Sequence, residues 1–272
     1  MKLLAILVGA DGTAACLDAA TTLARAADVP QIEALNVEVD PERLVAASEE
    51  IDIQRLRESH EGSAQQRSAA VHAAYAAWFA DAHEDAARVE WKSVVGAEAE
   101  TVKAEAAQAD VVVIVMAREG SMDGSDALEA AIFGSGKPTL LVPADWRAGK
   151  RKHFDHVVVA LSNTEIAEHA IAGSATILRK ATRVTALRIG SEDDPATGLI
   201  SDIEALGITP ELHIVARGEG DLGEQIASEA QALGADLIVA GAYRHGEIIE
   251  WLAGGTTRHL LAAAKLPLLL AH

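Results

Sequence analysis

Glycines close to the C-terminus are the residues best suited to bind a ligand. Gly241 follows an apolar run at 237–240, and Gly254, Gly255 and Thr256 precede a helical pattern at 258–265. A glycine after a strand lets backbone N–H groups approach an anion, and a helix that starts there adds the positive end of its dipole. The spacing therefore predicts a phosphate site between Gly241 and Gly255, with one of the two following threonines as the helix cap.

Cations accompany these glycines in a chain that is otherwise very acidic. Arg244, His245 and Arg258 supply local positive charge beside the predicted loop. Arg244 has two open interpretations, because its charge would replace backbone contacts to a phosphate while its bulk would fill the space. His245 has no second titratable residue at a fixed spacing, so the sequence does not assign it an acid–base role.

The segment that carries the glycines, 236–272, repeats the pattern of residue types at 110–143. Each copy has an apolar run after Ala-Asp, a glycine-containing loop, a helical pattern and a closing apolar run that begins with a proline. A repeat of this length predicts two similar α/β units in tandem. A polar, basic and unpatterned stretch at 144–153 separates them, so we predict domains at 1–147 and 153–272.

Each unit reads as alternating strands and helices, which predicts an open parallel five-stranded sheet with right-handed crossovers and helices on both faces. The first unit has strands expected at 3–8, 31–39, 89–95, 110–116 and 139–142, with a first helix of about 13 residues that ends near Ala27. The second unit matches them at 157–161, 184–189, 211–216, 236–240 and 266–271. The closing strands are apolar throughout, and pairing one with the other across a pseudo-two-fold axis would bury both.

The first unit is longer than the second. Leu35 matches Leu187, 152 residues on, whereas Asp110 matches Asp236, 126 residues on, so about 26 additional residues lie between the second and third strands. We expect an elongated helical segment at 41–87, broken near Gly62. Its aromatic side chains, at a spacing of three and four residues, predict core packing or a lid over the sheet: His72, Tyr75, Trp78 and Phe79.

Composition excludes several classes of function. A formal charge of −18 argues against a nucleic-acid partner, because the phosphates would be repelled over most of the surface. No run of 18 or more apolar residues and no signal-peptide layout occurs, so we expect a soluble, cytoplasmic protein without a membrane partner. The single cysteine, Cys16, fits a reducing compartment and is interpreted as a small buried filler of the first helix.

With these features in place, the chain resembles the universal stress protein family in its tandem form. The resemblance rests on an aspartate after the first strand and on a loop of the form Gly, two residues, Gly, nine residues, Gly, Ser or Thr after the fourth. It implies an adenine nucleotide alpha hydrolase-like topology, and ATP or ADP with accompanying Mg²⁺ as the ligand. It implies no protein-held metal site and no catalytic residues.

Transferred to this sequence, the family's site is divided between the units. In the first unit the resemblance assigns adenine contacts to Asp11 and Val37, but Ala117 stands in place of the first loop glycine. The remaining loop positions there are Gly120, Gly134 and Ser135. In the second unit Ser162 replaces the aspartate, with helix capping as its alternative role, and Ile189 corresponds to Val37. The second unit keeps more of the loop: Gly241, Arg244, His245, Gly254, Gly255 and Thr256.

Three functions follow from this division. The first is a stress-response protein that binds an adenine nucleotide in its C-terminal domain as a sensor or regulator. The second is a scaffold or binding module that uses the same fold without nucleotide, with the intramolecular pseudo-dimer as its main feature. The third is a weak ATP hydrolase, although neither unit has a pyrophosphatase-type Ser-Gly-Gly loop or a Walker lysine. Association of two chains into a further homodimer is compatible with all three.

Overall fold

The first half of the chain forms five strands and the helices that connect them. The computed structural model describes residues 1–39, 48–116, 125–149, 151–161, 165–190, 197–241 and 256–271. The elements of the first unit are β1 (Leu3–Ile6), α1 (Ala10–Ala27), β2 (Ile32–Glu38), α2 (Ser48–Glu61), α3 (Ala64–Asp81), the short helix η1 (His83–Arg88), β3 (Val89–Val95), α4 (Glu98–Ala106), β4 (Val111–Val115), α5 (Ser125–Glu129), the π-helical turn η2 (Ala130–Gly134) and β5 (Thr139–Val142).

The second half repeats the arrangement with shorter connections. Its elements are β6 (His156–Ala160), α6 (Glu165–Leu178), β7 (Arg183–Ile189), α7 (Thr197–Ala205), β8 (Glu211–Val215), α8 (Leu222–Ala232), β9 (Leu237–Gly241), α10 (Thr256–Ala263) and β10 (Leu268–Ala271). The described strands lie where the sequence predicted them, within two residues at each end.

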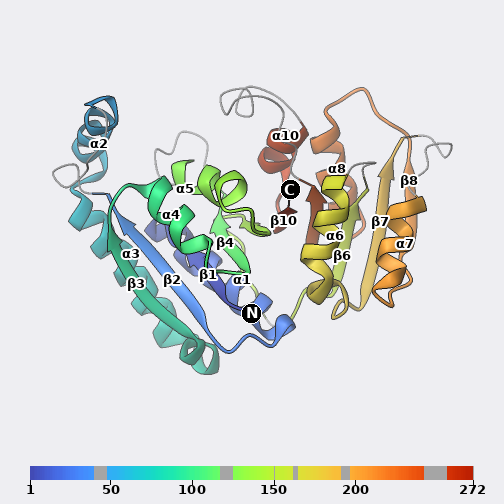
Figure 1. Cartoon of the computed structure of the whole chain (residues 1–272), viewed down its shortest axis with the longest axis horizontal. Helices are drawn as coiled ribbons and strands as arrows, with labels where there is room; N and C mark the ends of the chain where they lie inside the picture. The colour runs from blue at the N-terminus through green and yellow to red at the C-terminus, as the bar shows by residue number, and fades with distance from the viewer. Residues whose placement is uncertain are drawn as a thin grey trace.

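All described strands belong to one sheet, in the order β3-β2-β1-β4-β5-β10-β9-β6-β7-β8. Neighbours within each half are parallel, and the two halves meet where β5 and β10 pair antiparallel, with Leu269 opposite Leu140. Leu140 and Leu269 are at most 1% exposed. The predicted fold, two parallel five-stranded units joined through their closing strands, is therefore confirmed (Figure 1).

Two helical layers cover the sheet. The apolar cluster on one face contains side chains of α1, α3, α6 and α7, and the cluster on the other contains side chains of α4, α5, α8 and α10. Alternate residues of each strand face opposite layers, so Leu3 and Ala5 join the first cluster whereas Leu4 and Ile6 join the second. Both clusters extend across the two units.

The inserted segment of the first unit forms two helices rather than one. Gly62 separates α2 from α3 with a φ of +88°, which only glycine adopts without strain. Ser63 then starts α3 with a capping box, because its side chain accepts from the N–H of Gln66 while the Gln66 side chain accepts from the N–H of Ser63. The predicted break near Gly62 is confirmed.

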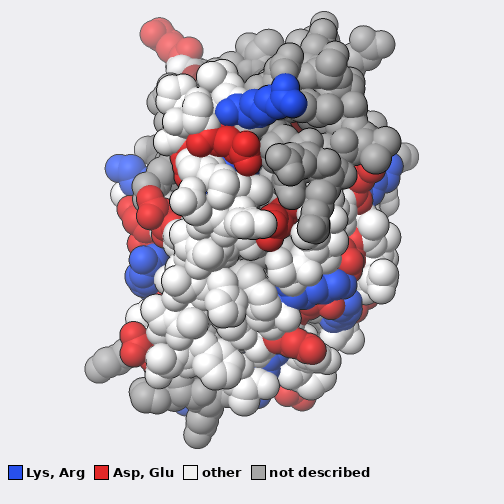
Figure 2. Space-filling model, turned by 90° about the vertical axis from the view of Figure 1, so that its left-hand side faces the viewer, with Lys and Arg blue, Asp and Glu red and all other residues white. Residues whose placement is uncertain are grey.

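One face of α3 packs on the core. Tyr75 and Trp78 are buried, and the Trp78 Nε1–H donates to Asp18 of α1 at 2.8 Å, so the predicted core packing holds for these two aromatic residues. Phe79 is 43% exposed and His72 is exposed as well, so the predicted core packing is wrong for these two rings. Between Arg67 and Asp81 the helix carries no Lys, Arg, Asp or Glu, and Figure 2 shows a largely uncharged band on this side of the molecule.

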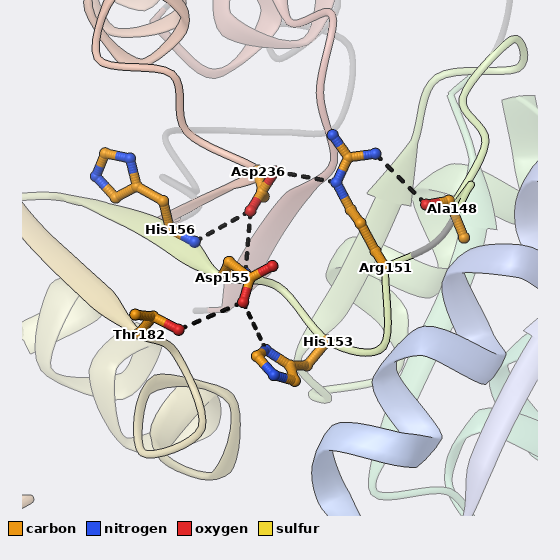
Figure 3. A network of polar contacts seen from close by, with 7 residues as sticks. All are labelled: Ala148, Arg151, His153, Asp155, His156, Thr182 and Asp236. Atoms are coloured by element: carbon orange, nitrogen blue, oxygen red, sulfur yellow. Dashed lines mark hydrogen bonds and ion pairs between the residues drawn. The ribbon is translucent and has the colours of Figure 1, made fainter.

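The connection between the units packs against both of them. The backbone N–H of Ala148 donates to Asp18 at 3.3 Å, and Phe154 is fully buried. Asp236 accepts from the backbone N–H groups of Asp155 and His156 at 3.0 and 3.1 Å, and from Arg151 Nε at 3.1 Å (Figure 3). The stretch 144–153, expected to be unpatterned, therefore contacts α1 of the first unit through Ala148 and Asp236 of the second unit through Arg151.

The first helix begins earlier than the sequence suggested. A helix of about 13 residues that ends near Ala27 would start near residue 15, but α1 starts at Ala10 and runs for 18 residues. Gly12 lies in the first turn of α1. A larger residue would clash at this position, because its Cβ would lie 2.9 Å from Val115 Cγ1. The glycine is thus needed for close packing of the helix on β4, and Asp11 lies in the helix rather than at the end of the strand.

Candidate functional site

The second unit brings two of its predicted phosphate-site residues to one edge of the sheet. Gly241 is the last residue of β9 and pairs with Ala271 of β10, while Thr256 is the first residue of α10. Because the parallel strands of a unit end at the same edge, Ile189, the last residue of β7, lies at that edge as well. The other predicted residues lie outside the described part of the chain: Ser162, Arg244, His245, Gly254 and Gly255.

An acidic side chain lies beside the first turn of α10. Asp221 caps α8 by accepting from the N–H of Gly223 at 2.8 Å, and its other carboxylate oxygen contacts His259 Nδ1. A protonated imidazole would form an ion pair with this carboxylate, whereas a neutral one would leave its negative charge near the helix N-terminus. The charge that a ligand meets at this edge therefore depends partly on His259, which sequence reasoning did not select.

The first unit has a cavity of about 330 Å³ at the corresponding edge. Asp11 lines it, together with the ends of β1 and β4 and the first turns of α1. Val37, the second predicted adenine contact, does not line it, and packs instead with the cluster on the opposite face of the sheet. Of the two adenine contacts assigned to this unit, the structure thus places only Asp11 at the cavity.

Three polar residues of the inserted helices also line this cavity, and sequence reasoning missed them. They are Glu61, Gln66 and Arg67. Arg67 donates from Nη1 to the carbonyl of Gly62 at 2.6 Å, and burial together with the nearby guanidinium of Arg57 lowers the pKa of Arg67. The helix break at Gly62 is the sequence signal that could have located them, because it turns the start of α3 toward the sheet.

Gly134 and Ser135 do not precede a helix, contrary to their assignment as a phosphate loop. Gly134 ends η2, and the Ser135 hydroxyl donates to the carbonyl of Ala131 at 2.6 Å while accepting from the N–H of Lys137. The free N–H groups that bind anions belong to the start of a helix, so this location is unsuited to a phosphate. α5, which precedes β5, starts at Ser125, just as α10, which precedes β10, starts at Thr256. Gly120 lies outside the described residues.

The carboxyl group of Glu98 lies close to the start of α5. Glu98, the first residue of α4, accepts from the backbone N–H of Ala127 in α5. Burial raises the pKa of Glu98 to about 7, the carboxylate of Asp126 adds to this effect, and Arg57 opposes it. An added phosphate would meet the carboxyl groups of Glu98 and Asp126 here, which disfavours its binding.

The described residues show little sign of catalytic chemistry. Cys16 is fully buried with its Sγ 3.6 Å from the carbonyls of Ile6 and Val113, and burial raises the pKa of its thiol above the usual range, so it is not a nucleophile. Across the described ranges, no group of three or more His, Cys, Asp or Glu residues is arranged to hold a metal ion. Among the described helices, none has both the length and the apolar character to cross a membrane.

Comparison with known proteins agrees with this architecture. Residues 202–272 match the model of the Universal stress protein family. No curated protein matched the sequence. A universal stress protein from Archaeoglobus fulgidus DSM 4304 is 14% identical and aligns over 99% of this chain and 95% of its own, with a TM-score of 0.62.

Two further solved structures are similar. A functionally unknown protein from Pseudomonas aeruginosa PAO1 is 13% identical over 99% of this chain and 92% of its own, with a TM-score of 0.58. A universal stress protein solved in complex with cAMP aligns with 44% of this chain and 97% of its own, at 18% identity and a TM-score of 0.38. The chain has the fold of universal stress proteins over nearly its whole length, and its residues 202–272 match the model of that family.

Proposed function

We propose that this protein is a universal stress protein-like stress-response protein that binds an adenine nucleotide, ATP, in its C-terminal unit as a sensor or regulator. One observation carries the proposal: Gly241 and Thr256, the two ends of the predicted phosphate loop, close β9 and open α10 within the segment that matches the family. Ile189 ends a strand at the same edge, where the resemblance assigns an adenine contact.

The arrangement supports an anionic ligand on physical grounds. A strand that ends in glycine permits a close backbone approach, and the start of the eight-residue α10 offers N–H groups with no partner inside the helix. The loop between them contributes Arg244 and His245, which offset part of the repulsion expected from a chain of charge −18. Mg²⁺ would enter with the nucleotide and not through a protein-held site.

Calorimetric titration with MgATP tests this proposal. We expect a saturable heat from the purified chain that disappears in Gly254→Val, because a branched side chain in the glycine loop would block the phosphate. Gly198→Val is the matched control, since Gly198 lies exposed in α7 and a Cβ there meets no atom within 4 Å. Absence of heat at millimolar MgATP, or equal heat from both variants, would reject binding at this loop.

A scaffold without nucleotide is the second candidate, and the contact between Asp221 and His259 favours it. A carboxylate next to the first turn of α10 disfavours phosphate whenever His259 is neutral. This function predicts protein that purifies without a bound small molecule, which mass spectrometry of the denatured sample would establish. Release of ADP with turnover during the titration would instead indicate a weak hydrolase.

A further inference from the structure

One wall of the cavity of the first unit is formed by a helix that has no equivalent of its length in the second unit. The ends of β1 and β4 and the start of α1 form one side of this cavity, and α3 forms the other. α3 belongs to the inserted segment, whose counterpart in the second unit is the nine-residue α7. A cavity wall formed by α3 is therefore specific to the first unit.

α3, which forms this wall of the cavity, is fixed by a buried side chain and by hydrogen bonds. Val71 of α3 faces the core at 3% exposure, and the Ser68 hydroxyl donates to Asn36 Oδ1 at 2.8 Å. The Asn36 side chain in turn donates to the carbonyl of Leu7, a residue of the cavity wall, at 3.1 Å. These bonds tie α3 to the end of β1, so the cavity is built by packing and does not depend on the position of one loop.

Most of the wall is apolar. Carbon-rich side chains come from both the sheet and the inserted helix: Ile6, Leu7, Val8, Val71, Val115 and Met116. Ligand cavities range from about 300 to 1,000 Å³ and are mainly apolar with a few placed polar groups, so a volume of about 330 Å³ suits a small molecule with an apolar body.

Arg67 is the one cation among the residues that line this cavity in the described part of the chain. A guanidinium carries five N–H donors, and the bond from Nη1 to Gly62 uses one of them. Burial and the neighbouring charge of Arg57 disfavour the charged form of Arg67, the carboxylates of Glu61, Glu58 and Glu98 favour it, and the net effect lowers the pKa of Arg67. A single anionic group beside Arg67 would relieve that cost and provide a charge-assisted hydrogen bond.

The two carboxylates at the cavity restrict the ligand to low charge. Glu61 is already paired with Arg57 Nε at 2.8 Å, and Asp11 lies in the first turn of α1. A polyphosphate would bring several negative charges toward both groups, whereas a monoanion adds only the charge that Arg67 can balance.

We propose that the first unit binds a small carboxylic acid with an apolar body, its carboxylate on Arg67 and its body against Val115 and Met116. The site is separate from the nucleotide loop proposed for the second unit and does not depend on it. Its ligand also differs from the nucleotide proposed there.

Sodium octanoate and octan-1-ol, which share an apolar chain and differ in charge, are suitable probes for calorimetry on the full chain. We expect octanoate to bind at least about tenfold more tightly than octanol, and Arg67→Gln to weaken octanoate about tenfold while leaving octanol unchanged. Arg55→Gln, at an exposed arginine of α2, should leave both affinities unchanged. Equal affinities of the two probes for the unmodified chain would overturn the proposal.

Filling the cavity provides a second, steric test. Ala70 is an exposed residue of α3 that lines the cavity, and its neighbour Ala69 is exposed but does not line it. Ala70→Trp should abolish binding of octanoate and Ala69→Trp should retain it, with circular dichroism to verify folding of both. Octanoate binding that survives Ala70→Trp would place the ligand elsewhere and reject the site. Gly254→Val should remove only ATP, so failure of one proposal can be told from failure of the other.

Discussion

The two units share a strand order, and a large difference between them lies in the connection of the second strand to the third. Between the second and third strands the first unit places α2 and α3, of 14 and 18 residues, whereas the second places only α7, of nine. The strand order is unchanged by this difference, but a cavity with Arg67 in its wall is present in the first unit. The sheet therefore sets the common edge at which both candidate sites lie, and the connections decide what chemistry that edge offers.

The largest expected effect concerns the pairing of β5 with β10, which makes the two units one body. Leu269→Ala removes a side chain that is 1% exposed opposite Leu140, and should lower the free energy of unfolding by about 2–5 kcal/mol. Urea unfolding followed by circular dichroism should show one transition, shifted as a whole. Two separate transitions, with only one displaced, would show that the units unfold independently.

Asp110 and Asp236 occupy matching positions in the two units but differ in their hydrogen bonds and exposure. Asp110 accepts from the backbone N–H of Lys2 at 2.6 Å, whereas Asp236 accepts two backbone N–H groups and Arg151. The side chain of Asp236 is 15% exposed and that of Asp110 is 59% exposed. Asp236→Ala should therefore cost about 2 kcal/mol of unfolding free energy and Asp110→Ala less than about 1 kcal/mol. Equal losses in urea titrations would mean that the connection between the units adds no stability through Asp236.

The pH dependence of stability should differ between the units because of Glu98. The corresponding first residue of α8 is Leu222, which cannot titrate. The native pKa of Glu98 is raised from 4.5 to about 7, so the native state binds a proton more tightly than the unfolded chain. Its contribution to stability is complete below pH 4.5 and is lost as the pH rises through 7.

Glu98→Gln should accordingly be more stable than the unmodified chain at pH 8, by about 1–2 kcal/mol, and equal to it at pH 4. Thermal or urea unfolding across this range provides the measurement. Glu100→Gln, at an exposed position of the same helix, is the control and should show no such difference. Burial lowers the pKa of His156, so its contribution to stability changes with pH in the opposite direction to that of Glu98. His156 is present in both proteins, so its effect cancels when their free energies of unfolding are compared. A constant difference at all pH values would contradict the prediction.

The smallest expected effect lies at the two outer strands. Lys92 of β3 reaches both Glu105 at 2.6 Å and Glu33 at 3.2 Å, whereas Arg183 of β7 pairs with Glu211 alone, and both members of that pair are well exposed. Lys92→Met should cost about 0.5–1 kcal/mol and Arg183→Met less than about 0.5 kcal/mol. A larger loss from Arg183→Met in chemical unfolding would reverse the ranking.

Strands and their order could be predicted from the sequence, because apolar runs such as Val111–Val115 are buried on both faces of a parallel sheet. The pairing of the closing strands followed from the need to cover two apolar edges. The break at Gly62 was visible because glycine and a capping serine together end one helix and start the next.

Features that depend on tertiary contacts could not be predicted in the same way. Gly12 looked like a loop residue, and only the nearness of Val115 explains a glycine inside α1. Gly134 and Ser135 were chosen as a Gly-Ser pair without reference to the closing strand. Thr256 lies 11 residues before Pro267, and the same distance before Pro138 leads to Ala127, which lies inside α5 two residues after its first residue, Ser125. The break at Gly62 marks the start of α3, but the sequence does not show that Arg67 lines a cavity, since the cavity exists only when α3 lies on the sheet.

Because the two units belong to one polypeptide, the β5–β10 pairing does not require the association of two chains. Two separate chains joined by the same strands would come apart on dilution, so their stability would depend on protein concentration, whereas one polypeptide is free of that dependence. A symmetric dimer must also carry each residue twice, once on either side of its axis. Within a single chain each half is encoded separately, so one half can carry α2, α3 and an arginine-lined cavity while the other keeps a short connection.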